Sequence, residues 1–577
     1  MSDPPGIAWF VVGDDAAAVV VVACDAEGRE LSRERVDVAA WPDAVRRRAA
    51  DETASARWVW SDTPRWDDPL AAAGVRVARC HDLRLCHAIL RDTELIPEAP
   101  ALRAHTEWDA AAPVDPPVAQ ALFDWDDGAV VRGVPHGIDD ALAEFARQRA
   151  AIASASDAGR LRLLCAAESA GALIAVELRA AGLPWDVDAH ERLLVETLGS
   201  RPLAGGRPAR LASLAEDIRS ALGDPKANPD SPPQLLRSLH RVGLAVESTS
   251  RWELREVEHP VIAPLLEYKK LARLFSANGW AWLGEWVHDR RFRPVYVPAG
   301  VVTGRWASSG GGALQIPRML RRAVRADPGW LLVTADVAQL EPRVLAAMAG
   351  DLQLADAARD GDLYQGIVDA GAVGSRAEAK VALLGAMYGA TTGDSGRLLP
   401  GLRRAYPRAM GLVDEAARTG ERGGVVHTWL GRTSAPPGDR WGVVQAAAAE
   451  PDASRADVDR ARRQGADRGR FTRNFVVQGT AAEWALAWLG DLRARLAAFE
   501  PVGDDEAAAA SGILFARVPH LAFFLHDELI VHTPARCAEQ VAQAVQDAAD
   551  AATRLLFGGF PLDFRLDVKI GPTAEKE

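Results

Sequence analysis

The sequence has little of several residue types, and each shortage excludes a class of protein. Its 577 residues include only five cysteines, scattered and never in a CxxC pair, which excludes a disulfide framework and a thiolate zinc site. No stretch of about 18 apolar residues runs without a charge, so no membrane span is expected. The N-terminus, MSDPPGIAWFVVGDD, lacks the basic region of a secretory signal. These shortages predict a soluble intracellular protein.

The charge balance is acidic, with 67 Lys and Arg against 79 Asp and Glu and a net charge of −12. This balance argues against indiscriminate nucleic-acid binding, although a basic groove can lie in an acidic body. Only six of the basic residues are lysines, so a lysine inside a helix, such as Lys380, stands out from the arginine bias. The composition, 48% hydrophobic and 25% charged, is typical of a globular chain, and its length predicts about three to five domains.

The first half of the chain changes from strands to helices. Residues 7–36 alternate apolar stretches with turn-like GDD and DAEG, which predicts a β-meander. Residues 95–127 are proline-rich and predict an irregular linker. A helix within 168–186 should end at Gly182, and helical runs continue to about 282.

The second half contains β-capable runs that end in carboxylates. Residues 331–336, LLVTAD, form one such run, and residues 520–534 predict two strands that meet at His526-Asp527. Residues 376–389 predict a strong helix. Residues 435–468 are polar and alanine-rich, and they predict an insertion made of a loop with a solvated helix.

Asp336 and Asp527 are the main candidates for chemistry. A single aspartate at a strand end is more often a turn or helix cap. Two of them brought together by a sheet could hold two Mg²⁺ ions about 3.5–4 Å apart for in-line nucleotidyl transfer, because Mg²⁺ prefers oxygen ligands and keeps sites for substrate phosphates.

The helix over 376–389 carries a second pattern. Arg376, Lys380, Leu384 and Tyr388 recur every four residues and therefore share one face. Two cations followed by an aromatic ring suit a triphosphate and a base. The alternative is a solvated basic edge beside a buried Leu/Tyr stripe.

Five blocks, in this order, resemble signature segments of family A DNA polymerases, the bacterial DNA polymerase I type. The likeness extends from about residue 168 to the C-terminus. The blocks are TGRWASS (303–309), TADVAQLEPRVLA (334–346, like motif A), RAEAKVALLGAMYG (376–389, like motif B), RFTRNFVVQGTAAE (470–483) and LHDELIV (525–531, like motif C).

The resemblance implies an α+β multidomain fold: a right-hand polymerase of palm, fingers and thumb, preceded by a ribonuclease H-like α/β domain of the 3′–5′ exonuclease type. The implied domains are the exonuclease-like domain at 1–155, the thumb at 156–282, the palm at 283–348 and 470–577, and the fingers at 349–469 with the 435–468 insertion. No 5′-nuclease domain is expected ahead of them.

The resemblance also implies a role for each site residue. Asp336, Asp527 and the backbone of Val337 would hold the metals, with Glu528 in support. Arg376 and Lys380 would bind the triphosphate, and Lys380 could protonate the leaving pyrophosphate. Glu341 would be a steric gate against a 2′-hydroxyl. The other implied contacts are Gln339, Leu384, Tyr388 and Tyr364 for the incoming nucleotide, and Arg305, Arg470, Asn474, Gln478 and His526 for DNA.

Two site residues depart from the family pattern. Leu384 stands where motif B has Phe or Tyr, so no ring is available to stack on the nucleotide. Tyr364 stands where a His touches the phosphates, and it can donate a hydrogen bond but carries no positive charge.

The N-terminal region lacks the carboxylates of a proofreading site. Its two D-x-E triplets, Asp25-Ala-Glu27 and Asp92-Thr-Glu94, fall in a turn and at the end of a helical run, and the first tyrosine of the chain is Tyr268, so no Y-x-x-x-D motif precedes it. We therefore expect a degenerate domain without proofreading.

The sequence thus predicts a DNA-templated DNA polymerase for repair or replication, working with two Mg²⁺ or Mn²⁺ ions on primer–template DNA and dNTPs. We expect it to act as a monomer in the cytoplasm, associated with the nucleoid and not with a membrane. A catalytically impaired DNA-binding relative is the main alternative. Glu341 argues against a single-subunit RNA polymerase or primase. A generic phosphatase or nuclease is disfavoured because its chemistry does not require the Arg/Lys stripe on 376–389.

Overall fold

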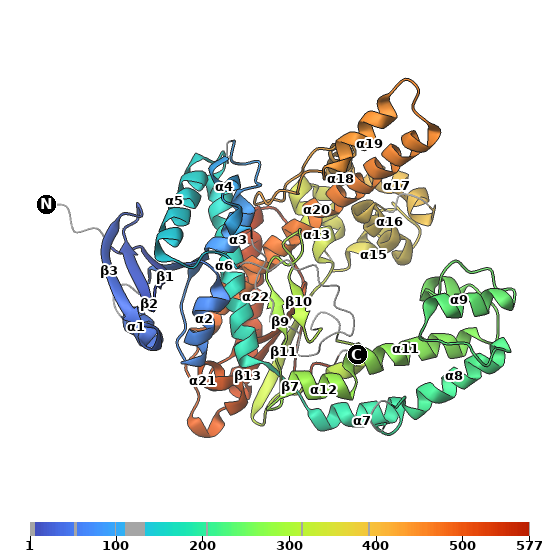
Figure 1. Ribbon diagram of the computed structural model, residues 1–577, viewed down its shortest axis with the longest axis horizontal. Helices are drawn as coiled ribbons and strands as arrows, with labels where there is room; N and C mark the ends of the chain where they lie inside the picture. Colours follow the sequence, from blue (N-terminus) through green and yellow to red (C-terminus); the bar gives the residue numbers. More distant parts are fainter. Residues whose placement is uncertain are drawn as a thin grey trace. The chain divides into compact units, whose positions relative to one another are not determined.

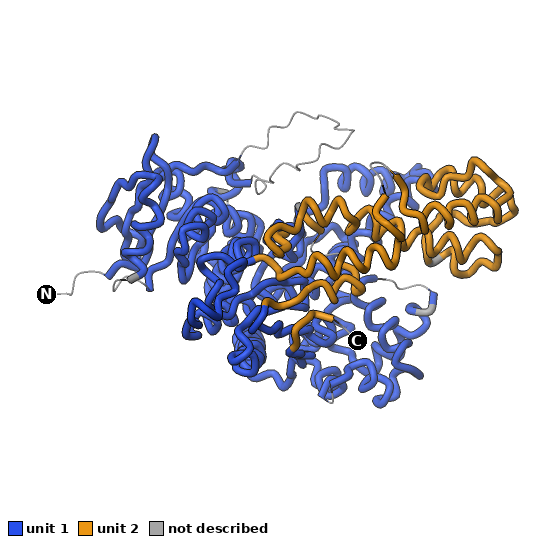
Figure 2. The backbone as a smooth tube through the Cα atoms, turned by 90° about the horizontal axis from the view of Figure 1, so that it is seen from below, with its two compact units in different colours: residues 1–181, 295–310, 328–570 blue, residues 182–294, 311–327, 571–577 orange. Residues whose placement is uncertain are grey.

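The computed structural model describes residues 6–50, 55–97, 100–109, 133–202, 206–312, 316–359, 361–389 and 393–575 (Figure 1). The chain divides into two compact units (Figure 2). Unit 1 contains residues 1–181, 295–310 and 328–570, and unit 2 contains residues 182–294, 311–327 and 571–577. Among the described residues, no helix is both long enough and apolar enough to cross a membrane.

Unit 1 begins with a five-stranded mixed sheet in the order β3-β2-β1-β4-β5. The first three strands pair antiparallel, and β4 and β5 continue the sheet parallel to β1. The strands are β1 (Trp9–Asp15), β2 (Ala18–Cys24), β3 (Glu30–Asp37), β4 (Arg57–Trp60) and β5 (Cys80–Asp82). The predicted meander is confirmed, and the strand order and directions are those of the expected ribonuclease H-like domain.

Helices cover both faces of this sheet. One face packs a tryptophan-rich core against α1 (Trp41–Ala50) and α2 (Thr63–Ala72), and the other packs against α5 (Ile138–Ser154). This two-sided burial explains why β1 and β2 read as continuous apolar runs. The domain also contains α3 (Leu83–Leu90) and α4 (Pro100–Arg103), so the predicted linker includes a short helix. Residues 98–99 and 110–127 of that linker lie outside the described residues.

The helix α6 (Ala158–Ala181) follows and is buried along most of its length. It ends where Gly182 takes a positive φ of 67°, as the sequence predicted. The helix packs on α2 and on α20 within unit 1, so the range expected for the thumb is shared between the two units.

A four-stranded sheet, ordered β12-β13-β11-β14, carries the two candidate aspartates. Its strands are β11 (Trp330–Val337), β12 (His520–Leu525), β13 (Glu528–Pro534) and β14 (Leu566–Gly571), with α22 (Ala538–Phe557) packed on β11 and β13. The three strands predicted from sequence are confirmed. A smaller hairpin pairs β9 (Val295–Val297) with β10 (Ala307–Gly310).

Helices α13 to α19 follow β11 in unit 1. They are α13 (Leu340–Ala349), α14 (Leu352–Ala357), α15 (Leu363–Asp369), α16 (Arg376–Tyr388), α17 (Gly393–Ala405), α18 (Pro407–Glu421) and α19 (Arg440–Ala449). The predicted helix over 376–389 is therefore confirmed as α16, which begins after the cap Ser375 and ends at Gly389, where φ is 75°.

The 435–468 insertion is more helical than the sequence indicated. The helix α19 has no buried residue, and α20 (Arg455–Leu496) runs unbroken from the insertion into the 470–483 block. Its 42 residues span about 63 Å at 1.5 Å per residue. The exposed first turns carry the ion pair Arg460–Asp457 at 3.1 Å, the kind of i,i+3 pair that supports a solvated helix.

Unit 2 consists mainly of helices around an aromatic core. Its helices are α7 (Val187–Leu198), α8 (Ala209–Leu222), α9 (Pro232–Arg241), α10 (Arg251–Arg255), α11 (Ile262–Asn278) and α12 (Trp280–Trp286), and its strands β6 (Leu183–Pro184), β7 (Val287–His288) and β8 (Arg291–Phe292) form a small sheet. Trp185, Trp282 and Phe292 pack together with ring centroids 4.9–5.7 Å apart.

A buried ion-pair network joins the N-terminal domain to α20. Glu177 on α6 accepts hydrogen bonds from Arg76 at 2.7 and 3.0 Å and from Arg493 at 2.7 and 3.0 Å. Arg493 also donates to the carbonyls of Val77 and Ala78, both at 2.7 Å. The two arginines hold the pKa of Glu177 at about 2, although burial alone would raise it.

Asp67 lies in the same buried region and titrates in the opposite direction. Burial, reinforced by the charge of Glu177, raises the pKa of Asp67 to about 8. Because the folded state then binds this proton more tightly than the unfolded chain, ionising Asp67 should reduce stability progressively as pH rises from about 4 through 8.

We expect Asp67→Asn to gain stability over the unaltered chain as pH rises from 5 to 9, by a few kcal/mol at pH 9. Urea unfolding across this pH range measures the difference, and Asp139→Asn, at an aspartate whose side chain is 91% exposed, is the control. A difference independent of pH would show that Asp67 is ionised in the folded protein at all of these pH values.

Candidate active site

The register of β11 against β13 places the candidate carboxylates at one edge of the sheet. Asp336 pairs directly opposite Glu528, so the two side chains lie on the same face. Asp527 occupies the turn before β13, and its carbonyl accepts a hydrogen bond of 2.8 Å from the backbone N–H of Val337. Asp336 is half-buried, Asp527 is exposed and Glu528 is buried. The structure therefore brings together the two aspartates that the sequence separates.

The electrostatics of this edge favour a divalent cation. Burial by the surrounding strands raises the pKa of Asp527 to about 6, even though the side chain reaches solvent, and the nearby charge of Asp336 raises it further. In the described part of the chain, no group of three or more His, Cys, Asp or Glu side chains could hold a metal ion. Asp336 and Asp527 could hold an ion that takes its other ligands from water and substrate phosphates, as Mg²⁺ does.

A polar triad lies beside the carboxylates. Glu341, at the start of α13, accepts hydrogen bonds from both Arg305 and the hydroxyl of Tyr388. Arg305 comes from the hairpin β9–β10 and Tyr388 from the last turn of α16. Burial first, and then the Glu341 hydrogen bond, raise the pKa of Tyr388, so the tyrosine stays a hydrogen-bond donor at neutral pH. The triad joins three elements that the sequence keeps apart.

The stripe on α16 faces outward. Arg376 and Lys380 are exposed, Leu384 is half-buried and Tyr388 is 40% exposed. Buried alanines, Leu383 and Met387 form the opposite side of the helix. The alternative of a buried Leu/Tyr stripe is wrong, because Leu384 is only half-buried and Tyr388 is exposed, although the Tyr388 hydroxyl reaches the buried Glu341.

Gln339 and the backbone N–H of Tyr364 both donate to Asp362, which also binds Arg376 at the start of α16. Gln339 has a positive φ of 52° and donates to Asp362 at 3.0 Å. The ring of Tyr364 is buried, and the Arg376 guanidinium lies 5.7 Å from its centroid. Tyr364 therefore supports Arg376 through its ring face.

The proposed DNA-contact residues occupy two places. Asn474 and Gln478 lie half-buried on α20, where Gln478 accepts a hydrogen bond of 2.8 Å from Thr303, and Arg470 pairs with Asp467 one turn earlier. His526 has a φ of 53° in the turn before Asp527. Burial, and then the charge of Arg305, lower the pKa of His526 to about 4, so its ring is neutral at pH 7.

Two further residues of the site, Arg343 and Asp362, lie in family-like segments but were given no role from the sequence. Arg343, within the 334–346 block, is buried and donates to four carbonyls: Ala338 at 2.9 Å, Ala358 at 3.3 Å, Asp563 at 2.7 Å and Gly361 at 2.6 Å. Asp362, the cap of α15, accepts hydrogen bonds from Gln339 and Arg376. The position of Asp362 just before the helix that starts at Leu363 is typical of a helix cap. Such a pattern does not show that the side chain also binds Gln339 and Arg376.

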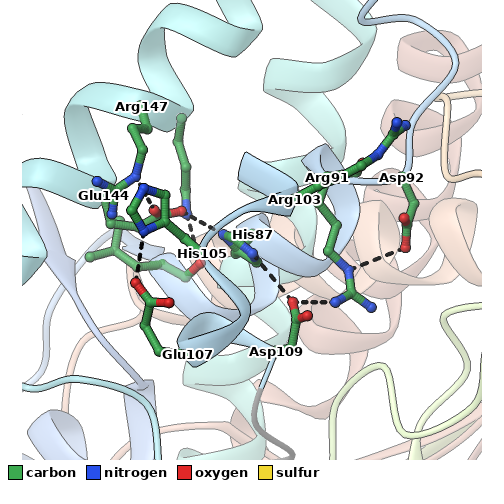
Figure 3. Close-up of polar contacts among 11 residues, drawn as sticks. His87, Arg91, Asp92, Arg103, His105, Glu107, Asp109, Glu144 and Arg147 are labelled. Atoms are coloured by element: carbon green, nitrogen blue, oxygen red, sulfur yellow. Dashed lines mark hydrogen bonds and ion pairs between the residues drawn. The ribbon is translucent and has the colours of Figure 1, made fainter. Parts of the chain in front are cut away.

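The two D-x-E triplets of the N-terminal domain follow β2 and α3 and are not on the first strand. The interior of β1, Phe10 to Val12, is apolar and buried, and Asp25 is bonded to Arg29 at 2.7 Å within its own turn. Figure 3 shows the neighbourhood of Asp92, which pairs with Arg91 at 3.2 Å. In the same view His87 lies between Glu144, at 2.7 Å, and Asp109, at 3.3 Å. Both D-x-E triplets therefore lie away from the first strand, with their aspartates paired to arginines.

Comparison with known proteins decides the family. The model of DNA polymerase family A matches residues 207–575. The chain belongs to DNA polymerase family A. The matched range includes Asp336, Asp527 and the whole of α16, so the candidate site lies inside the family A region.

Individual relatives give the same family. The chain is 25% identical over 562 residues to the thermostable DNA polymerase I of Thermus aquaticus, covering 88% of this chain and 61% of the relative. It is 28% identical over 403 residues to the DNA polymerase I of Chloroflexus aurantiacus, covering 62% and 38%. The chain thus spans less than two thirds of the length of these family A relatives.

A solved structure shares the fold along nearly the whole chain. It is the POL domain of Pol1 from M. smegmatis in complex with DNA primer-template and dNTP. The TM-score is 0.67 at 19% sequence identity, and the match covers 98% of this chain and 95% of the other. The similarity includes the N-terminal domain, which lies outside the residues matched by the family A model.

Arg343→Lys should destabilise the family A region. A lysine cannot reach all four carbonyls, so we expect a loss of about 2–4 kcal/mol in the free energy of unfolding, measured by urea denaturation. Arg359→Lys is the control, because Arg359 is 72% exposed and pairs only at the surface with Asp356, and it should cost less than about 0.5 kcal/mol. Equal losses would contradict the role given to Arg343.

Proposed function

We propose that this family A chain is a DNA-templated DNA polymerase that adds deoxynucleotides to a primer 3′-hydroxyl. The observation that carries the proposal is that Tyr388, at the end of the exposed Arg/Lys stripe on α16, donates to Glu341, which lies five residues after Asp336. Strand-end acids alone would also suit a nuclease or phosphatase, and the stripe on α16 distinguishes this site by providing cations for a triphosphate.

Asp336, Asp527 and the carbonyl of Val337 would hold two Mg²⁺ ions, with Mn²⁺ as a substitute. Bound there, the ions would lower the pKa of the primer hydroxyl and neutralise charge on the reacting phosphate. The buried Glu528, opposite Asp336, would keep the acidic edge in place. The raised pKa of Asp527 supports this assignment, because an unneutralised pair of carboxylates favours cation binding.

The stripe on α16 would bind the incoming nucleotide. Arg376 and Lys380 would take the triphosphate oxygens, and Lys380 would protonate the leaving pyrophosphate. Glu341 would lie under the sugar, where Arg305 and Tyr388 hold its carboxylate and leave no room for a 2′-hydroxyl. Leu384 and Tyr388 would pack near the base, and Gln339 and Tyr364 would form the base of the phosphate site.

The DNA would lie along the half-buried face of α20. Asn474 and Gln478 would contact the minor-groove edge of the primer–template, and Arg470 its backbone, because such contacts test pair shape without reading sequence. His526, neutral and held by a strained turn, would touch the primer end.

The N-terminal domain would lack proofreading. Support comes from the apolar interior of β1 and from the engagement of Asp25 and Asp92 with arginines. Its function would be structural, because Glu177 on α6 binds Arg493 of α20, the helix that carries Asn474 and Gln478. This role would be contradicted if the chain shortened a mismatched primer in the presence of Mg²⁺ and if Asp25→Ala or Asp92→Ala abolished that shortening.

A catalytically impaired DNA-binding relative is a second candidate, favoured by the absence of a ring at Leu384 and by the burial of Tyr364. The two candidates differ in one result: tight primer–template binding without extension would identify the impaired relative.

Asp336→Ala and Asp527→Ala should each reduce primer extension with dNTPs and Mg²⁺ by about three orders of magnitude or more, because each removes a metal ligand. The melting temperature should stay within a few degrees of the unaltered chain. Asp567→Ala, at an exposed position on β14 of the same sheet, is the control and should extend normally. Retained extension in either of the first two variants would contradict the assignment.

Leu384→Phe should lower the KM for dNTPs by roughly two- to tenfold, because a ring can stack on the nucleotide with a gain of about 0.5–1.5 kcal/mol. Single-nucleotide incorporation kinetics measures this change. Leu384→Met, which is similar in volume but has no ring, should leave KM unchanged. If Met and Phe lower KM equally, packing volume and not stacking is responsible.

A further inference from the structure

We infer that Asp362 is a positioning residue for the nucleotide triphosphate: it orients Arg376 and ties it to the turn that follows catalytic strand β11. This inference rests on the proposed polymerase function. Asp362 lies outside the stripe on α16 and outside the metal-binding edge, and it would act through Arg376 without touching the nucleotide.

Asp362 connects three elements through its two carboxylate oxygens. One oxygen, Oδ1, accepts from Gln339 Nε2 at 3.0 Å and from the backbone N–H of Tyr364 at 3.1 Å. The other, Oδ2, accepts from Arg376 Nε at 2.5 Å. The carboxylate therefore binds the turn after β11, the start of α15 and the first residue of α16 at once.

The contact with Gln339 is reciprocal, which makes the connection rigid. Gln339 donates through its amide nitrogen to Asp362, and its amide oxygen accepts from the backbone N–H of Leu363 at 3.2 Å. These bonds hold Gln339 at a positive φ of 52°, a conformation that a non-glycine residue adopts only when its surroundings fix it. Gln339 is the second residue after β11, the strand that carries Asp336, so Asp362 is held in a fixed position relative to Asp336.

The geometry at Arg376 leaves the phosphate-binding nitrogens available. Asp362 accepts its hydrogen bond from Nε, and no hydrogen bond joins the terminal nitrogens of Arg376 to any residue that the structure describes. The ring of Tyr364, 5.7 Å from the guanidinium, supports one face of it. A guanidinium fixed at Nε presents its two terminal nitrogens in a set direction, the arrangement that suits a phosphate.

Asp362 is ionised at neutral pH. Burial alone would raise its pKa, but the Arg376 hydrogen bond and the backbone N–H groups of α15 hold the pKa of this carboxyl below its usual range. Two alternative roles for Asp362 have to be distinguished from this one. In the first, its carboxylate only caps α15. In the second, its negative charge neutralises Arg376 and so weakens phosphate binding. The three readings predict different changes in the KM for dNTP.

Three substitutions separate these readings in primer extension with dNTPs. Asp362→Asn keeps a carbonyl oxygen for the cap and for Arg376, so its KM should stay within about threefold of the unaltered chain. Asp362→Ser keeps a capping hydroxyl but cannot reach Arg376, so its KM should rise roughly tenfold with kcat changed less than about twofold. Asp362→Ala should raise KM at least as much as Ser. Ser375→Ala, which removes the cap of α16 without touching the guanidinium, is the control and should keep the KM of the unaltered chain.

A double-mutant cycle tests whether Arg376 transmits the effect. In an Arg376→Ala background, Asp362→Ser should cause no further rise in KM, because the group that it positions is gone. An additive rise would overturn the inference and leave a direct or structural effect of Asp362. Melting temperatures of all variants show whether loss of fold contributes.

The remaining outcomes are also decisive. If KM is unchanged in Asp362→Ser but raised in Asp362→Ala, Asp362 only caps α15. If KM is lowered in both Asp362→Asn and Asp362→Ser, Asp362 weakens phosphate binding. Either result overturns the inference, while extension by the unaltered chain still upholds the proposed function. Absence of extension by the unaltered chain would overturn the proposed function, and the inference with it.

Discussion

The antiparallel register of β11 against β13 is the constraint on which the site depends. It sets Asp336 opposite Glu528, and the hydrogen bond from Val337 to the carbonyl of Asp527 closes the end of the pair. Successive side chains of a strand point to opposite faces, so a slip of one residue would turn Asp336 away from Asp527. Near this end of β11, Val333, Ala335 and Val337 are buried whereas Thr334 and Asp336 are half-buried. A slip would exchange these two faces and is opposed by the loss of apolar burial.

The other parts of unit 1 are attached to this sheet edge by buried polar contacts. Arg343 binds carbonyls from three segments, and Glu177 with Arg493 joins the N-terminal domain to α20. Unpaired charges in these places would be costly, so each contact fixes the position of the elements that it joins. The N-terminal domain thereby supports α20, the helix that carries Asn474 and Gln478.

Local pattern was enough to predict much of the fold. The strands at 331–336 and 520–534, the helix at 376–389 and the end of α6 at Gly182 follow from apolar periodicity and cap residues, and the structure confirms them. The full length of α20 was not predicted, because its solvated first turns carry no apolar stripe. Contacts over long distances in the chain, such as Gln339 with Asp362 or Arg305 with Glu341, could not be predicted, since no local pattern specifies which polar partners the fold brings together.

The most direct test of the account is the number of metal ions bound at the sheet edge. Electron paramagnetic resonance can count Mn²⁺ bound to the chain with primer–template DNA and a non-hydrolysable dNTP analogue. We predict two ions per chain, and fewer in Asp527→Asn, where the charge at the turn is lost. Mn²⁺ binding that is the same in Asp527→Asn as in the unaltered chain would contradict the claim that Asp336 and Asp527 form the catalytic metal site.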